Sequence, residues 1–180
     1  MPVRSITHSK RISSGLKPTQ QLALSGVLAA LIFVATYWLH FQLPFMSGGY
    51  VHLGDGLILL SAELAGFAAV PAAALGSLLA DVLLGWAAYA VPSFLIKGGV
   101  AAAAVMAMRQ RRFFGKALGL ILAETLMVAG YFFTEWFILG FGYTGAWVNV
   151  AGNTVQGLSG VTLALTLEPA LRRAKLPKGQ

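Results

Sequence analysis

The chain has 180 residues, of which 57% are hydrophobic and only 11% are charged, and its mean hydropathy is +0.74. So few polar side chains cannot coat a water-soluble globule, which excludes that class and predicts an integral membrane protein. The formal net charge of +7 does not indicate a nucleic-acid partner, because the basic residues fall in short segments between apolar runs, and the lack of cysteine excludes disulfides.

The apolar residues fall into six spans, which predicts an all-α integral membrane protein with six transmembrane helices. The spans cover residues 22–41, 53–66, 71–85, 92–108, 117–139 and 147–167. A bilayer needs about 20 residues per helix, so the shorter second and third spans either tilt little or form a broken hairpin. We expect one membrane domain over residues 22–171, flanked by basic cytoplasmic tails at 1–21 and 172–180.

The first span carries small residues at helical spacing. Polar and basic residues precede it, and the apolar run then continues at spanning length, so we expect a retained helix and no cleavable signal peptide. In LSGVLAAL, Gly26 and Ala30 stand four positions apart, as do Ser25 and Ala29. Small residues at this spacing let two helix backbones approach closely, either within the chain or against another subunit.

The second, third and fourth spans carry Asp55, Asp81 and Lys97 at similar expected depths. A charge in hydrocarbon costs from about 2.5 to above 10 kcal/mol, depending on how the cost is measured. A lysine between two aspartates lowers the cost of burying each, so we expect one ion cluster that either links the three helices or contacts a polar solute. Loss of Lys97 should then cost more stability than loss of Asp55, because it leaves two buried carboxylates.

The fifth and sixth spans each carry a polar stripe with residues three or four positions apart. The members are Glu124, Val128, Tyr131 and Glu135 in the fifth span, and Asn149, Asn153, Gln156 and Gly160 in the sixth. Such spacing places each set on one face of a helix, and two polar faces on consecutive helices should meet. In hydrocarbon, these side chains need partners either in a neighbouring helix or in a polar ligand.

The outer part of these stripes supplies the candidate substrate-binding residues. Glu135, Asn149 and Asn153 belong to the half where a solute from outside would first be held, whereas the deeper Glu124 is expected to join helices. Trp136 and Trp147 lie beside these rows in the sequence and are candidates for stacking on a planar heteroaromatic ring.

Basic residues show an asymmetry that predicts the topology. Twelve of the 13 fall before the first span, between the fourth and fifth, or after the sixth, namely Arg4, Lys10, Arg11, Lys17, Arg109, Arg111, Arg112, Lys116, Arg172, Arg173, Lys175 and Lys178. With six spans, all three groups lie on one side of the membrane. The positive-inside rule then places both termini in the cytoplasm.

Five sequence elements, in order, give the chain a resemblance to a known family. HLGD, GSLLADVLLGW followed by AYAVPSFLIKGG, GYFFTEW, NTVQGLSG and the Gly26-x-x-x-Ala30 pair resemble elements of the S components of energy-coupling factor (ECF) vitamin transporters. The resemblance runs from about residue 22 to 171. In the first helix the family has Ala-x-x-x-Ala, and here glycine replaces the first alanine. The chain looks most like the branch with riboflavin, pyridoxine and hydroxymethylpyrimidine carriers, and no motif names the vitamin.

The resemblance implies a six-helix subunit of an ECF-type ABC importer in a prokaryotic plasma membrane. Such a subunit captures a vitamin or vitamin precursor from outside, and docks through its small-residue face onto a transmembrane coupling subunit (EcfT-like) powered by two ATP-binding subunits. By this resemblance, Ser25, Gly26, Ala29 and Ala30 would form the docking face. By the same resemblance the subunit itself would not be an enzyme, which agrees with the lack of a phosphate-binding loop in the sequence. No cofactor and no nucleic-acid partner are expected.

The same residues bear on other function classes. An ion-coupled secondary transporter would use the buried acids as cation sites, but such folds often show internal repeats and paired broken helices, which this sequence lacks. An intramembrane hydrolase would need a nucleophile with a histidine at plausible depth. His52 and Asp55 would give a metal ion only two ligands, so no metal site is expected. A structural scaffold would not need polar residues in the outer part of the fifth and sixth spans.

Overall fold

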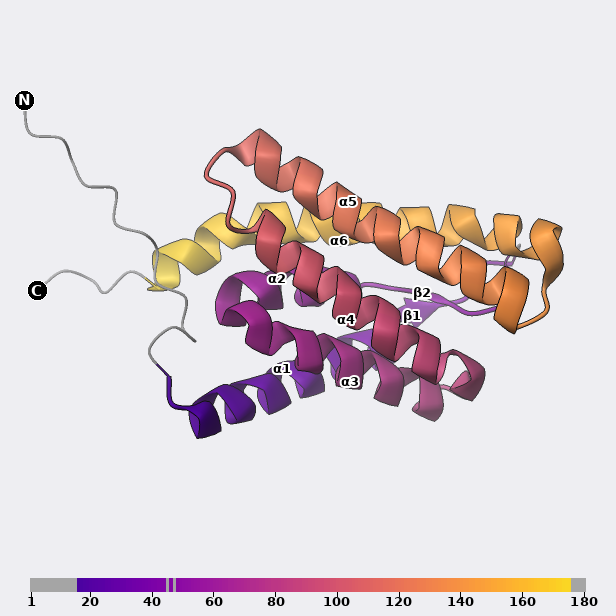
Figure 1. Ribbon diagram of the computed structural model, residues 1–180, viewed down its shortest axis with the longest axis horizontal. Helices are drawn as coiled ribbons and strands as arrows, with labels where there is room; N and C mark the ends of the chain where they lie inside the picture. The colour runs from indigo at the N-terminus through magenta and orange to yellow at the C-terminus, as the bar shows by residue number, and fades with distance from the viewer. Residues whose placement is uncertain (1–15, 45, 47, 176–180) are drawn as a thin grey trace, which may run out of the picture.

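A computed structural model describes residues 16–175 of the chain, except 45 and 47. In this part, six α-helices form one bundle (Figure 1). The helices are α1 (Pro18–Trp38), α2 (Gly54–Ala65), α3 (Ala69–Leu83), α4 (Ala90–Ala107), α5 (Phe113–Phe133) and α6 (Gly142–Lys175). The shorter elements are β1 (His40–Phe41), β2 (Val51–His52), the 3₁₀ turns η2 (Gly66–Ala68) and η3 (Ala87–Tyr89), and the π-helical turn η4 (Thr134–Ile138).

The two short spans form a helical hairpin. Gly66 has a φ of 61°, a left-handed conformation that glycine adopts without steric cost, and it ends α2 and reverses the chain through η2 into α3. Together the residues of Gly54–Leu83 make one 30-residue apolar run. Of the two alternatives expected for these short spans, little tilt or a broken hairpin, the structure has the hairpin.

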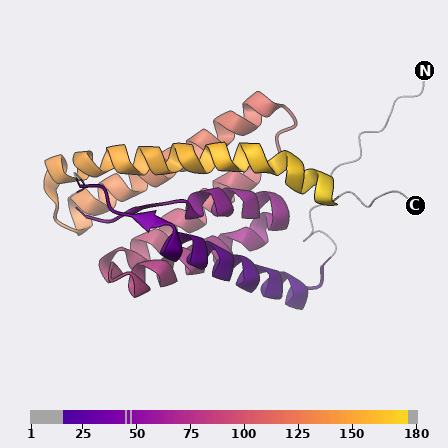
Figure 2. The same ribbon diagram turned by 180° about the vertical axis from the view of Figure 1, so that it is seen from behind.

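Neighbouring helices close the bundle around α2. In the order α1, α3, α4, α5, α6 and α2, each helix packs against the next. Helix α2 also contacts α1, α3 and α4. Viewed from behind, α6 runs the length of the bundle (Figure 2). Ile32, Ile58, Leu59, Val100 and Met127 are fully buried in the core. This arrangement is what allows charged residues of α2, such as Asp55, to lie inside protein rather than in lipid.

The outer surface of the bundle is apolar. Large side chains that point outward include Leu22, Val27, Leu122, Phe133 and Phe137, each more than half exposed. Four segments of the described residues are long and apolar enough to cross a bilayer, at Pro18–Trp38, Gly54–Leu83, Ala87–Ala107 and Phe113–Ile138. So much exposed apolar surface indicates that lipid covers it.

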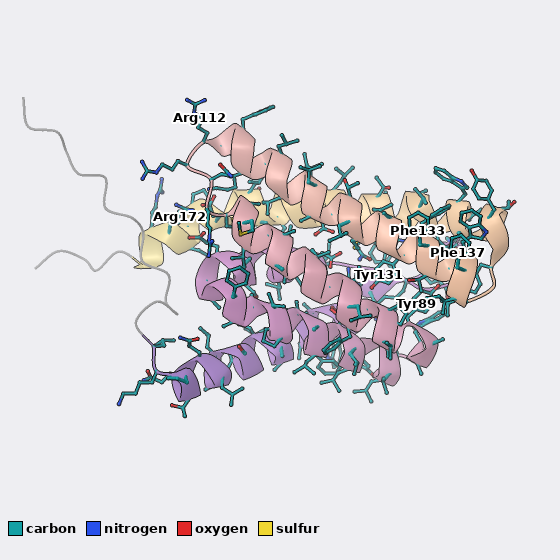
Figure 3. The ribbon with its side chains drawn as sticks, in the orientation of Figure 1. Tyr89, Arg112, Tyr131, Phe133, Phe137 and Arg172 are labelled. Atoms are coloured by element: carbon teal, nitrogen blue, oxygen red, sulfur yellow. The ribbon has the colours of Figure 1, made fainter. Side chains whose placement is uncertain are left out.

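Basic residues gather at one end of the bundle. The start of α1, the α2–α3 turn, the α4–α5 connection and the end of α6 lie together there (Figure 1). Arg112 and Arg172 mark this end, whereas Tyr89 and Phe137 lie toward the other (Figure 3). Lys17 occupies the N-cap position of α1 and belongs to the same end. The basic residues at positions 4, 10, 11 and 178, and most of the expected tails, lie outside the described residues.

A buried ion network ties three helices together at the basic end. Lys116 of α5 pairs with Glu168 of α6, with 2.5 Å between Nζ and Oε1. Arg172 of α6 pairs with the same Glu168 and, at 3.2 Å, with Glu63 of α2. Because Glu63 finds its partner outside its own helix, a carboxylate is tolerated in the apolar second span.

Arg172 is therefore expected to stabilise the fold more than its sequence neighbour. We expect Arg172→Ala to lower the free energy of unfolding by about 1–3 kcal/mol, because it leaves Glu63 without this partner at a buried position. Arg173→Ala is the matched control, since Arg173 is exposed and should change stability by under about 0.5 kcal/mol. Thermal melts in one detergent would measure both. Equal melting temperatures for the two variants would contradict the role given to Arg172.

Candidate ligand-binding site

A small polar cavity lies at the end of the bundle opposite the basic residues. Its volume is about 30 Å³. The lining comprises Met46, Gly48, Gly49, Tyr50, His52, Asp81, Tyr89, Ser93, Tyr131, Glu135, Asn153 and Gln156. They come from the segment between the two strands, from β2, α3, α4, α5 and α6, and from η3 and η4. This volume has room for water but not for a ring system, so a larger ligand requires the cover to move.

The cover is formed by the described residues of the segment between β1 and β2, which are 42–50 except 45 and 47. The antiparallel pairing of His40 with His52 fixes both of its ends. The side chain of Met46 lies against Gly152 of α6, where an added Cβ would stand 2.7 Å from its sulfur. Gly48 lies equally close to the ring of Phe141. The segment thus closes the cavity by contacts with α6 and with the residue just before it.

Two carboxylates face the cavity, and both are almost fully buried. Asp81 accepts a hydrogen bond from the hydroxyl of Tyr50 at 2.7 Å, and Glu135 accepts one from Tyr89 at 3.1 Å. The second oxygen of each, Oδ2 of Asp81 and Oε2 of Glu135, accepts no hydrogen bond of ordinary geometry from the described residues. Ser93 lies close to the first carboxylate and Asn149 to the second. Each acid therefore keeps acceptor capacity for a ligand.

Aromatic rings form much of the remaining wall. Tyr50, Trp86, Tyr89 and Tyr131 follow one another with ring centroids 6.4, 6.0 and 6.2 Å apart. The hydroxyl of Tyr131 shares a hydrogen bond of 2.7 Å with Ser93. Rings with hydroxyl groups at this spacing offer both apolar faces and polar edges to a flat solute.

His52 contributes a neutral imidazole from β2, outside the apolar helical segments. Its Nδ1 accepts a hydrogen bond from the backbone N–H of Gly54 at 3.0 Å, so the proton of the neutral ring is on Nε2. Burial lowers the pKa of His52 to about 3. At neutral pH the ring can therefore offer an N–H donor but no positive charge.

The floor of the cavity is built on an ion pair. Nζ of Lys97 lies 2.6 and 2.9 Å from the two oxygens of Asp55, and both residues are fully buried. Gln156 donates to Asp55 at 2.7 Å and accepts from the backbone N–H of His52 at 3.0 Å. Nζ of Lys97 also lies 2.9 Å from the sulfur of Met127. Lys97 is thus held beneath the cavity and does not line it.

The expected ion cluster is therefore divided in the structure. Lys97 and Asp55 pair directly, while Asp81 bonds Tyr50 and faces the cavity. Helix depth alone placed the three charges at one level, but it did not specify which helix faces meet. Because Asp81 lines the cavity, it joins the candidate ligand-binding residues.

The structure also separates the five candidate binding residues. Glu135 and Asn153 line the cavity, and Asn149 is fully buried beside Glu135. Trp136 and Trp147 do not line it. Trp136 stacks on Phe137, and both tryptophans contact Phe132 and Tyr143 on the outer side of α5 and α6. Residues one or two positions apart on a helix face different directions, so sequence neighbours of Glu135 and Asn149 point elsewhere.

Sequence reasoning missed several lining residues. Tyr89 and Ser93 precede Lys97 at intervals of four, so a polar stripe at the start of α4 was available as a signal. Tyr50 is the last residue of the covering segment and His52 lies in β2. Neither belongs to a helix, so no helical periodicity in the sequence marks them. The two polar stripes meet at Glu135 and Asn149, which lie beside each other.

The small residues of α1 belong to two different faces. Ser25 is buried and its hydroxyl donates to the carbonyl of Ala68 at 2.7 Å. The backbone of Ala29 lies against Gly76 of α3. By contrast, Gly26 and Ala30 are exposed, and nothing described lies within 4 Å of a Cβ added at Gly26. Only the second pair is open to another protein.

Comparisons with known proteins agree with this architecture. The sequence model of the family described as ECF-type riboflavin transporter, S component, matches residues 17–173. A solved structure from work titled "Structure and mechanism of the S component of a bacterial ECF transporter" has a TM-score of 0.74 and 20% identity, with 88% of this chain and 98% of that chain covered. No curated protein matches the chain significantly. At 20% identity, the similarity to this solved structure shows a shared fold and nothing more.

Proposed function

Because the chain belongs to the ECF-type riboflavin transporter S-component family, whose members bind substrate for transport and are not enzymes, we propose that it is the high-affinity substrate-binding subunit of an ECF-type ABC importer. Its substrate is a small vitamin or vitamin precursor of the hydroxymethylpyrimidine, pyridoxine or riboflavin class. The observation that carries the proposal is the polar cavity at one end of the bundle, where Glu135, Asn153 and three tyrosines converge.

The proposed topology has six transmembrane helices and both termini in the cytoplasm of a prokaryotic cell. The gathering of basic residues at the end that holds the start of α1 and the end of α6 supports it through the positive-inside rule. The cavity then faces outside, where the substrate is captured. Movement of the covering segment admits the ligand, because the cavity of about 30 Å³ does not accommodate it.

The partners in this proposal are a transmembrane coupling subunit and two ATP-binding subunits. The exposed pair Gly26 and Ala30 supports a docking role, since bare backbone at this spacing allows another helix to approach closely. Ser25 and Ala29 serve packing within the chain instead. Energy from ATP would reach the substrate through this contact.

An ion-coupled secondary transporter is the alternative, and the structure offers it no specific support. Asp55 and Glu63, two of the acids it would use as cation sites, are paired with Lys97 and Arg172. The two proposals differ in what drives uptake. Accumulation of substrate in vesicles that contain only this chain and an ion gradient would favour the alternative.

The binding site is tested by two substitutions in the cavity and one outside it. Glu135→Ala or Asn153→Ala should weaken binding by about 5- to 150-fold, because a buried polar group of the ligand loses a partner at a cost of about 1–3 kcal/mol. Trp147→Ala is the control, since Trp147 lies on the outer side of α6 and should leave affinity nearly unchanged. Glu124→Gln, deeper in the bundle and outside the cavity lining, should also change affinity little.

The measurement has two steps. A thermal-shift screen of the purified chain against B vitamins and their precursors finds the ligand, because 100 times the Kd stabilises by about 2.7 kcal/mol. Calorimetric titration then gives the affinity of each variant. Wild-type affinity in both cavity variants would place the site elsewhere.

A further inference from the structure

The electrostatic character of the cavity restricts which vitamin it can hold, and this step rests on the proposed function. Two carboxylates, Asp81 and Glu135, are among the lining residues, and no lysine or arginine is among those that the structure describes there. Lys97, directly below, is neutralised by both oxygens of Asp55. His52 supplies only a neutral ring. The cavity therefore presents two acidic side chains and, among its described lining residues, no lysine or arginine.

Each carboxylate has one oxygen held by a tyrosine, and Ser93 and Asn149 lie beside Asp81 and Glu135 as further polar neighbours. Tyr50 and Tyr89 donate to Oδ1 of Asp81 and Oε1 of Glu135, which fixes the orientation of both groups. Oδ2 of Asp81 and Oε2 of Glu135 are enclosed from solvent without a donor of ordinary geometry in the described part of the chain. A buried acceptor left unpaired is costly, so a ligand that donates to these atoms gains more than its contact area alone would give.

We propose that the substrate is a cationic or amino-substituted heteroaromatic base, which donates ring or amino N–H groups to Glu135 and Asp81 while its ring lies against the tyrosines. A carboxylate matches an aminopyrimidine or aminomethylpyridine edge well, because hydrogen bonds that involve a charged partner are shorter and stronger than neutral ones. Phosphate esters and carboxylated vitamins are excluded. Their charge would be buried beside two acids with no cation free to pair with it.

Two matched ligand pairs test the inference by calorimetric titration of the purified wild-type chain. The first pair is 4-amino-5-hydroxymethyl-2-methylpyrimidine and its 4-oxo analogue, and the second is pyridoxamine and 4-pyridoxic acid. In at least one pair, we expect the amino compound to bind about 10-fold or more tightly than its partner, as loss of one charge-assisted hydrogen bond predicts. Riboflavin and its phosphate ester are titrated alongside as an uncharged and an anionic ligand.

The variants Glu135→Gln and Asp81→Asn connect this preference to the two acids. Each keeps the shape of its side chain and replaces one oxygen by an NH₂ donor. We expect at least one of them to reduce the preference for the amino compound to under about 3-fold, because the charged acceptor is lost. Melting temperature measured without ligand reports whether each variant is folded.

The outcomes separate this inference from the transport proposal. Tight binding of riboflavin, its phosphate ester or 4-pyridoxic acid, without preference for the amino compounds, would overturn the inference and leave the proposed function standing. A preference that both folded variants retain unchanged would also overturn it, since the acids would then not cause it. No binding of any of the six compounds to folded wild-type chain would overturn the proposed function together with the inference.

Discussion

Replacement of Lys97 by methionine is expected to lower the free energy of unfolding by about 3–5 kcal/mol, the cost of leaving one member of a buried ion pair alone. The side chain of Lys97 is 1% exposed and that of Asp55 is not exposed at all, so water cannot replace the lost partner. Gln156 would remain as a donor to Asp55, but an amide carries no charge to balance the carboxylate. Methionine has a similar length, which limits the contribution of a cavity.

The sequence predicts a larger stability loss on removal of Lys97 than of Asp55, and the structure changes that expectation. Asp81 takes its hydrogen bond from Tyr50, so removal of Lys97 leaves one paired carboxylate bare rather than two. Asp55→Asn should therefore cost a similar amount, and the double variant Lys97→Met with Asp55→Leu should recover most of the loss. Melting temperatures in one detergent measure all three. A double variant that melts below both single variants would contradict a direct pair.

The helices were predictable because apolar length and charge placement are local properties. The short spans at 53–66 and 71–85 correspond to α2 and α3, and glycine and proline marked the places where apolar runs stop. The end of the last helix was less visible. The span was expected to close at 167, yet α6 continues to Lys175, because Glu168 and Arg172 hold each other and partners on α2 and α5 inside the bundle.

The site was predictable only as far as helical periodicity reaches. Glu135 and Asn153 stood out because their stripes repeat every three or four residues, and both line the cavity. Tyr50 and His52 come from a segment whose position depends on strand pairing and on contacts with α6, neither of which leaves a period in the sequence. Trp136 and Trp147 were chosen by proximity along the chain, which does not give the face of the helix.

Substitution of tryptophan for Gly26 is expected to abolish uptake while leaving ligand binding to the isolated chain nearly unchanged. The position faces away from the bundle, and no described atom lies within 4 Å of an added Cβ, so the indole ring extends into lipid without disturbing the fold. In the complete transporter the same ring would hold apart two helices that need close backbone contact. Ala30→Trp, one turn further along the exposed face, should act in the same way.

A matched control shows whether this loss is specific to the small-residue face of α1. Leu122→Trp places the same ring on the lipid-facing side of α5, where the native side chain is 60% exposed, and should retain both binding and uptake. Co-purification with the coupling subunit, measured beside vitamin uptake in cells, tells failed docking from failed transport. The docking assignment is wrong if Gly26→Trp and Ala30→Trp transport like the control. If they lose ligand binding in the isolated chain, the face acts within the subunit, because a ring that only blocks a partner cannot change the affinity of the cavity in its absence.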